Sequence, residues 1–293
     1  MAGHRSSGRL QFERVYAEAQ MPFPEFERCI YQNNPLASVI CQLRFPPILR
    51  VETAQPAEFQ DAVRTKNARN SYPLYASRRD GGVPAQIEPL LPPEFGQLIS
   101  TVHDFSSADG KWTISLNKHF VALSTKDYWR WEEFEAELAV ILPILQRIYA
   151  PAFFTRVGLR YQNVIRPSGI KQEPNSWAKL LNGHILGVLA GPALEIGQFR
   201  SVFTQAIIEL KDVQGAQVLL QHGLAEFEGE QCYVIDTDFN TDEQTEVKDA
   251  ISKLRVFQEK AGKLFQWCIT ERLHYAMEPI PLTDDRAKRS ECA

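Results

Sequence analysis

The chain has 293 residues, of which 44% are hydrophobic, 23% charged and 11% aromatic. This length allows a core to be buried without disulfides or a structural metal, and this composition excludes disordered, collagen-like and disulfide-framework proteins. The formal net charge of −4 excludes a global basic field of the kind that drives nucleic-acid binding, although it leaves room for a local basic patch.

The cysteines and the apolar runs of the sequence bear on its compartment. The five cysteines are widely spaced and form no Cys-x-x-Cys pair, so we interpret them as reduced thiols rather than disulfides or zinc ligands. Residues 1–20 hold no apolar run of signal-peptide length, and no later segment reaches about 18 uncharged apolar residues. The sequence therefore predicts a cytoplasmic protein that does not associate with a membrane.

The sequence predicts a first structural unit over residues 30–166, preceded by a flexible tail at 1–29. Its strands are expected at 38–45, 101–106, 112–116, 120–125 and 153–166. A short helix is expected near 56–65, and the glycines and prolines of 66–97 indicate loop or irregular edge structure. Apolar residues at spacings of three and four from Trp131 to Ile148 predict a long amphipathic helix, which Pro151 ends.

A second unit with the same order of elements is predicted over residues 199–282, before a short tail at 283–293. Its strands are expected at 199–211, 216–227 and 231–239. The run Thr241-Asp242-Glu243-Gln244 has the spacing of a capping box, which predicts the start of a long amphipathic helix extending to Cys268. Residues 167–198 connect the two units and include a short helix near 177–181.

The predicted fold class is therefore α+β, with two antiparallel-sheet units each covered by a long amphipathic helix. The shared order of elements suggests a duplication, although no residue-level repeat supports one. The helix at the C-terminal end of the chain has more apolar width than a single stripe needs. We expect this extra width to bury a second face against another subunit or a partner.

Local signatures of catalysis and of cofactor binding are missing from the sequence. It contains no Gly-x-Ser-x-Gly, no His-Glu-x-x-His, and no second histidine within one helical turn of any of its six. Phosphate-loop and dinucleotide fingerprints are also absent, so we expect no cofactor. These observations favour a protein that is not an enzyme, although residues distant in sequence can still form a catalytic site.

Two acidic patterns are candidates for metal-dependent chemistry. Asp236 and Asp238 alternate at the end of a predicted strand, so their carboxylates share a face and can jointly bind a divalent cation if a third oxygen ligand is present. The simpler interpretation is that they end the strand near the N-terminus of the next helix, where negative charge is favourable. The Glu209-x-Lys211 pair, with Glu195 upstream, has a spacing found in nucleases, but a solvated strand end explains it as well.

A basic pattern is the more informative one. Strand alternation places Arg156 and Arg160 on one face, with Gly158 between them leaving a shallow recess, and turns Arg44 away from the apolar side of its own strand. If these two strands are neighbours, three guanidinium groups share an open sheet face and can bind a phosphate or carboxylate. The alternative is a solvated face, or pairing with glutamates from a neighbouring element.

Aromatic residues complete the set of candidate binding residues. Trp131 and Phe134 fit the apolar stripe of the first long helix and are predicted to be core residues. Trp129 lies off this stripe and is predicted to mark a contact surface. Tyr161, directly after Arg160, is the fifth candidate binding residue beside the three arginines and Trp129.

Several motifs together resemble a bacterial protein family of about this length that is sporadically distributed and has no assigned activity. The resemblance covers about residues 30–280. It is carried by Tyr31-x-Asn33-x-Pro35-Leu36, by Val39-Ile40-Cys41-Gln42-Leu43-Arg44-Phe45-Pro46 and, most specifically, by Arg156-x-Gly158-Leu159-Arg160-Tyr161. It implies a single family fold and a bacterial setting, and the sporadic distribution implies a role in mobile elements or antiviral defence.

The leading hypothesis is a non-enzymatic, cytoplasmic adaptor or binding protein that acts by protein–protein interaction, as an accessory component of a bacterial defence or toxin-neutralising system. We expect a protein partner and leave homo-oligomers and nucleic acid, through the arginine patch, as alternatives. One rival hypothesis is a metal-dependent enzyme acting on nucleotides or nucleic acid through Asp236 and Asp238. The other is a sensor that binds a small anion over Arg44, Arg156 and Arg160.

Overall fold

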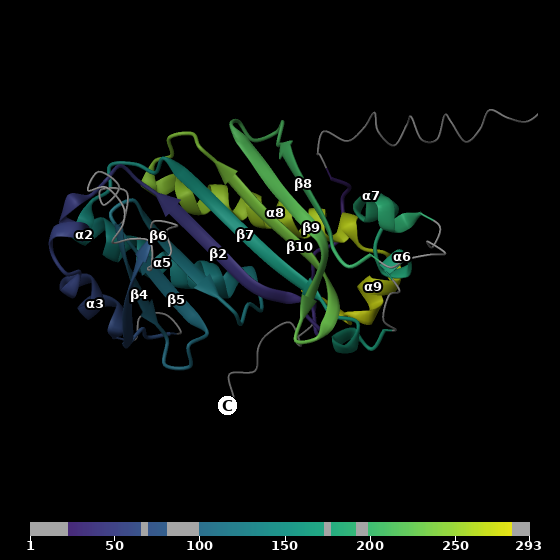
Figure 1. Cartoon of the computed structure of the whole chain (residues 1–293). Helices are drawn as coiled ribbons and strands as arrows, with labels where there is room; N and C mark the ends of the chain where they lie inside the picture. Colours follow the sequence, from purple (N-terminus) through teal and green to yellow (C-terminus); the bar gives the residue numbers. More distant parts are fainter. Residues whose placement is uncertain (1–22, 66–69, 81–99, 173–176, 192–198, 283–293) are drawn as a thin grey trace, which may run out of the picture.

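The computed structural model describes residues 23–65, 70–80, 100–172, 177–191 and 199–282. Nine strands of this part of the chain form a single antiparallel sheet in the order β3-β4-β5-β6-β2-β7-β10-β9-β8 (Figure 1). They are β2 (Leu36–Arg44), β3 (Leu74–Asp80), β4 (Ser100–Ser106), β5 (Trp112–Leu116), β6 (Phe120–Thr125), β7 (Arg156–Ile165), β8 (Val202–Glu209), β9 (Ala216–Phe227) and β10 (Glu230–Thr241). The mixed α+β class predicted from the sequence is confirmed.

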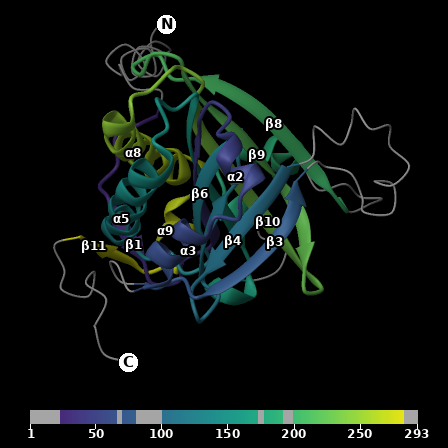
Figure 2. The same ribbon diagram turned by 90° about the vertical axis from the view of Figure 1, so that its left-hand side faces the viewer.

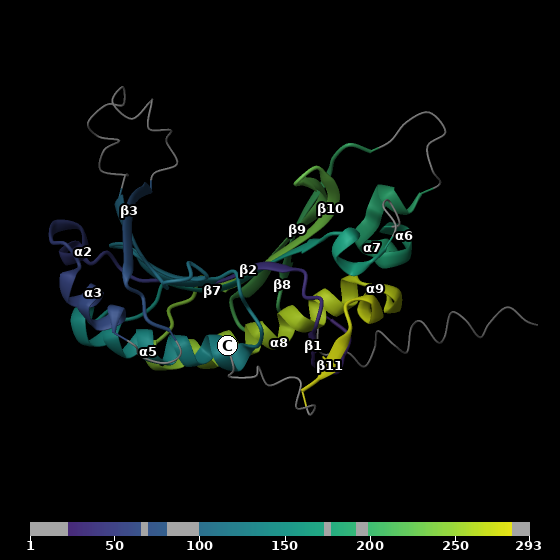
Figure 3. The same cartoon turned by 90° about the horizontal axis from the view of Figure 1, so that it is seen from below.

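Two long helices, α5 (Trp131–Tyr149) and α8 (Ala250–Cys268), cover one face of this sheet. They lie side by side behind the strands (Figures 1 and 2). Figure 3 shows that the sheet is curved and that both helices lie on its convex side. Among the described helices, none has both the length and the apolar composition that crossing a bilayer requires.

The alternation of side chains along each strand explains why helices cover only the convex face. In β2, Val39, Cys41 and Leu43 are at most 1% exposed and belong to the main core cluster, whereas Arg44 is exposed. Successive side chains of a strand point to opposite faces, so one strand supplies the core and a solvent-facing row at once. The convex face therefore needs apolar cover, and the stripes of α5 and α8 provide it.

Shorter elements pack around the edges of this core. α2 (Leu49–Thr53) and α3 (Ala57–Arg64) lie near β3 and β4, and η4 (Val247–Asp249) precedes α8 (Figure 1). α6 (Trp177–Leu180), α7 (Gly183–Leu186) and α9 (Glu271–Ala276) cluster beyond β10 (Figure 3). A small antiparallel sheet joins β1 (Cys29–Tyr31) to β11 (Pro279–Pro281) and so ties the two ends of the described chain together.

The prediction of two separate sheet units is not confirmed. β7 belongs to the first predicted unit and β10 to the second, yet the two strands pair over nine residues, from Tyr233↔Ile165 to Thr241↔Val157. The sheet therefore continues across the predicted boundary at 167–198. Local sequence patterns predict where strands lie but not which distant strands pair, so the pairing of β7 with β10 could not be predicted from them.

Two local expectations were wrong, and a third, that of loop or irregular edge structure at 66–97, was confirmed only in its edge position. The 66–97 stretch contains β3, whose Arg78 Nε donates to Asp104 Oδ2 of β4 at 2.9 Å; polar side chains are tolerated there because β3 is an edge strand. The predicted capping box is not a helix start, because Thr241 ends β10 and α8 begins only at Ala250. In the predicted N-terminal tail, Phe23 is buried against Trp267, with ring centroids 5.9 Å apart.

The apolar width of the C-terminal helix is also covered within the chain itself. Leu264 and Leu273 are fully buried, and Trp267 stacks on His184 with ring centroids 3.8 Å apart. The expectation that this width awaits a second subunit was therefore wrong for these residues. The predicted segments 1–22, 81–99 and 283–293 lie outside the described residues.

Candidate functional site

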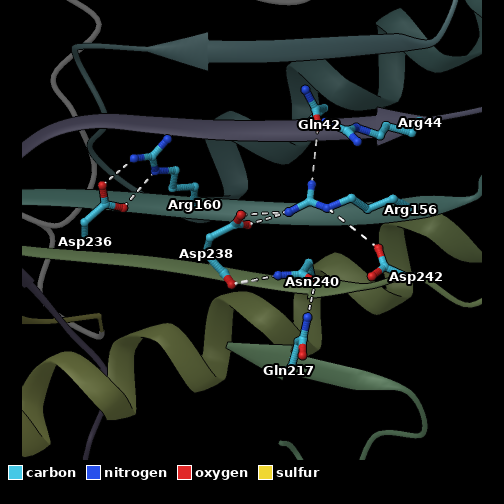
Figure 4. A network of polar contacts seen from close by, with 9 residues as sticks. All are labelled: Gln42, Arg44, Arg156, Arg160, Gln217, Asp236, Asp238, Asn240 and Asp242. Carbon is cyan, nitrogen blue, oxygen red and sulfur yellow. Dashed lines mark hydrogen bonds and ion pairs between the residues drawn. The ribbon is translucent and has the colours of Figure 1, made fainter. Parts of the chain in front are cut away.

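The three arginines predicted from the sequence lie on the concave face of the sheet. β2 pairs directly with β7, which sets Arg44 opposite Arg156 and Ile40 opposite Arg160. Residues directly opposite each other in an antiparallel pair share a face, so the condition on which the arginine prediction rested is met. Figure 4 shows the three side chains with their polar neighbours from β2, β7, β9 and β10.

Arg160 is bound to Asp236 of the neighbouring strand. Its Nε donates to Asp236 Oδ1 at 2.8 Å and its Nη2 to Oδ2 at 2.5 Å, a bidentate arrangement that the planar guanidinium favours. Gln162 Nε2 donates to the same carboxylate at 3.0 Å, and Gln162 Oε1 accepts a hydrogen bond from Ser38 Oγ at 2.5 Å. The hydrogen bonds to Asp236 raise the pKa of Arg160 further above its ordinary value.

Arg156 is bound to Asp238 through a single nitrogen. Its Nη2 donates to both carboxylate oxygens, at 2.9 and 2.7 Å, while Nη1 donates to Gln42 Oε1 at 3.4 Å (Figure 4). Its guanidinium lies over Gly158, where an added Cβ would come within 2.2 Å of Arg156 Nη1. The recess that the sequence predicted at this glycine is therefore real but filled, because the chain's own arginine occupies it.

Arg44 differs from the other two arginines. Its Nε donates to Gln42 Oε1 at 3.0 Å, and no carboxylate within the described residues pairs with its exposed side chain. Gln42 thus links Arg44 to Arg156 through one amide oxygen. Arg44 is consequently the cation of this face that is best placed to meet an acidic group from outside the chain.

Asp236 and Asp238 share the concave face, as their spacing predicted, but each is held by a different arginine. A divalent cation would have to displace these arginines to gain the carboxylates. In the described ranges, no group of three or more His, Cys, Asp or Glu side chains is arranged to hold a metal. The alternative explanation by a helix N-terminus does not apply, because α8 begins 12 residues after Asp238, at Ala250. Cross-strand ion pairing is the role that the sequence interpretation of these two residues missed.

Trp129 and Tyr161 lie on the other side of the sheet from the arginines. Tyr161 is 7% exposed, and its hydroxyl is 3.4 Å from that of Tyr128. Trp129 packs against Ile30 and Ile280 of the small sheet. Both line a cavity of about 620 Å³ on the convex side. The five predicted binding residues therefore belong to two separate places.

The remaining acidic candidates do not meet. Glu209 is exposed at the end of β8, the edge strand of the sheet, and Lys211 follows it in the turn toward β9. Residue 195 lies outside the described residues. Nothing in the described part of the chain joins Glu209 to the Asp236 and Asp238 pair.

Two exposed apolar residues on the same face as the arginines, three strands away from β7, were missed by the sequence interpretation. Phe203 and Ile207 of β8 are 68% and 62% exposed, and Ile207 pairs with Leu219, which pairs with Asp238. These residues therefore continue the concave face to its edge. Apolar residues that alternate in a strand normally indicate burial, so the sequence alone predicts Phe203 and Ile207 to be core residues. Only the position of β8 at the edge of the sheet, which the structure shows, identifies them as exposed.

The chain matches no protein-family model, no curated protein and no solved structure with which it was compared. The family resemblance of its motifs therefore stays a prediction.

Proposed function

We propose that this chain is a non-enzymatic adaptor that holds a protein partner on the concave face of its sheet. The single observation that carries the proposal is the pair of exposed apolar side chains, Phe203 and Ile207, on the edge strand of a face that none of the described helices covers. Phe203 and Ile207 lie on the same face of β8 with Gln205 between them, and large apolar side chains that remain exposed on one face are a recognised sign of an interaction surface.

The edge strand supplies the backbone part of such an interface. β8 is the last strand of the sheet, so along its outer edge the backbone N–H and C=O groups have no strand partner within the described residues. An extended segment of another protein can pair there and place its own alternate side chains over Phe203 and Ile207. Such pairing explains why an exposed edge carries apolar rather than charged side chains.

The polar network gives this surface its selectivity. Arg156 and Arg160 are held in one geometry by their aspartates, so the partner meets a rigid array of guanidinium, carboxylate and amide groups. Arg44 has no carboxylate of its own in the described residues and can bind an acidic side chain of the partner. The preferred partner is therefore a protein with an extended apolar segment and a nearby acidic group.

Site-specific photo-crosslinking tests this proposal. A photoreactive phenylalanine analogue at position 203 is expected to crosslink one protein in the native cell, and the complex with that protein, once purified, should dissociate at least about tenfold more readily after Ile207→Asp. Leu49, which is 67% exposed on α2, is the matched control position for both the crosslinker and the aspartate substitution.

Equal crosslinking from positions 203 and 49, or an affinity that Ile207→Asp leaves unchanged, would contradict the proposal. A crosslink between two copies of this chain would instead identify a homo-oligomer that pairs β8 with β8.

The two rival functions receive less support from the same geometry. An anion sensor needs free guanidinium groups, yet Arg156 and Arg160 are already bound to carboxylates. A metal-dependent enzyme needs carboxylates that are free to bind the cation, yet Asp236 and Asp238 are the carboxylates that these arginines already bind. The accessory role in bacterial defence rests on the family resemblance alone and remains part of the proposal.

A further inference from the structure

The convex side of the sheet holds a cavity of about 620 Å³ between α5 and α8. Its floor is formed by β7 and β10, and one side is closed by β1 and the residues just before it. This volume lies within the range of about 300–1,000 Å³ that is typical of small-molecule sites. The cavity is open to solvent, so a ligand can enter it from outside.

The floor of the cavity carries buried polar groups with unused hydrogen-bonding capacity. Thr237 of β10 and Asn163 of β7 are 3% and 5% exposed, and both line the cavity. Asn163 Nδ2 donates to the Ile235 carbonyl at 3.3 Å, and neither its side-chain oxygen nor the Thr237 hydroxyl has a hydrogen-bond partner among the described residues. Both groups are therefore available to a ligand in the cavity, to which they can donate or from which they can accept a hydrogen bond.

Phenol hydroxyls lie next to these groups. Tyr161 is directly opposite Thr237 in the β7–β10 register, and its hydroxyl lies 3.4 Å from that of Tyr128. Burial raises the pKa of both tyrosines well above its ordinary value, so both phenols stay uncharged at neutral pH. The floor therefore offers hydrogen bonds but no charge.

The charged side chains around the cavity are already paired with one another. Basic and acidic residues contribute equally to the lining, four of each. Arg28 is paired with Glu132 at 2.8 Å, and Arg255 with Glu135 at 3.0 Å. Lys263 is paired with Glu259 at 2.7 Å. A charged ligand would lose its hydration without gaining a free counter-charge, so the lining favours a neutral one.

The walls include five aromatic side chains, those of Phe26, Tyr31, Trp129, Trp131 and Phe265. Ring faces and edges interact well with a flat, polarisable molecule, because offset stacking and edge-to-face contacts add to the burial of its area. A planar ligand is therefore favoured over a branched aliphatic one.

α8 leaves the cavity open at its midpoint. Gly262 lines the cavity, and a Cβ added there would meet no atom within 4 Å. Glycine in a helix interior is about 1 kcal/mol less favourable than alanine, so this position is not explained by helix stability. A larger side chain at Gly262 would project into the space, which makes the glycine a feature that keeps the cavity available.

From this geometry we propose that the cavity binds a small, uncharged, planar molecule that has both a hydrogen-bond donor and an acceptor. The molecule stacks on the aromatic walls and exchanges hydrogen bonds with Thr237 and Asn163. This site is independent of the proposed adaptor surface, because it lies on the opposite side of the sheet.

Three isosteric probes test the charge and shape of the ligand: 2-naphthamide, 2-naphthoate and 2-naphthamidine, which are neutral, anionic and cationic. Calorimetric titration of the full chain should give saturable binding of 2-naphthamide and at least about tenfold weaker binding of the two charged probes. Equal affinity for the three, or no binding of 2-naphthamide, overturns the proposal.

Three variants then locate the binding. Gly262→Leu should abolish 2-naphthamide binding by filling the cavity, whereas Gly262→Ala should retain it and raise the melting temperature. Thr237→Val keeps the side-chain shape and should weaken binding about tenfold by removing one hydrogen bond. Binding that survives Gly262→Leu unchanged lies elsewhere and overturns the assignment; retained cooperative melting of each variant shows that it is folded.

Discussion

The two faces of the sheet are made by the same strands and yet behave in opposite ways. The convex face is mostly apolar, is covered by α5 and α8, and lines an open cavity between them. The concave face carries cross-strand ion pairs, amides and an apolar edge, and no helix of the described part of the chain covers it. Strand alternation alone separates them, because neighbouring residues of one strand contribute to different faces.

This contrast teaches how a mildly acidic chain can carry an arginine-rich surface. Each arginine of the Arg156 and Arg160 pair stands beside an aspartate of β10, so the concave face has a dense arrangement of charges but little net charge. On the convex side, stability comes from buried apolar area instead. We therefore expect substitutions on the two faces to differ in size and in how they couple to their neighbours.

The largest expected effect is on the convex face. Leu43→Ala removes a side chain that is 1% exposed in the main core and should lower the free energy of unfolding by about 2–5 kcal/mol. Ile40→Ala is the matched control in the same strand, because Ile40 is half-buried on the concave face and should cost clearly less. Chemical denaturation measures both. Equal losses would mean that the concave face is covered in solution.

An intermediate effect is expected at the glycine beneath Arg156. Gly158→Ala places a Cβ where the Arg156 guanidinium lies, which displaces it from Asp238 and should cost about 1–3 kcal/mol. In an Arg156→Ala background the same change should be nearly neutral, because the clashing atoms are gone. A double-mutant cycle by denaturation measures this coupling, and additive losses would show that the backbone rather than the arginine requires the glycine.

The smallest expected effect is at Arg44. Arg44→Ala should change the free energy of unfolding by less than about 0.5 kcal/mol, because this exposed side chain has no carboxylate partner in the described residues. Arg156→Ala, one strand closer to β8 in the same network, should cost more because it leaves Asp238 without its arginine partner. Thermal melting compares the two, and a larger loss at Arg44 would assign it a structural role.

Much of the fold could be predicted from local patterns, and its errors have physical causes. The strands around Val39–Leu43 and Val157–Tyr161 were predicted because period-two alternation and β-branched residues mark a half-buried strand. β3 was missed because an edge strand tolerates the polar residues that indicate a loop. The capping box at Thr241 was misread because its hydroxyl accepts a hydrogen bond from the Glu243 amide in a turn, before the helix starts.

The candidate site could be predicted only in part, because alternation assigns a side chain to one face of its own strand but does not show which strands are neighbours. Alternation correctly assigned Arg44, Arg156 and Arg160 to one face, and Asp236 and Asp238 to one face. It could not predict that these two faces are the same, so the arginines and aspartates were interpreted as separate binding sites. Their pairing depends on β7 and β10 being neighbours across 64 residues of intervening chain.

The sequence by itself determined which side chains lie on each side of every strand, since alternation is a local property of the backbone. Only the tertiary structure decided which strands are neighbours, and hence that each aspartate meets an arginine, that an apolar strand stands at the edge, and that a cavity remains between α5 and α8. These outcomes depend on contacts between distant segments, whose order in the sheet no local pattern records.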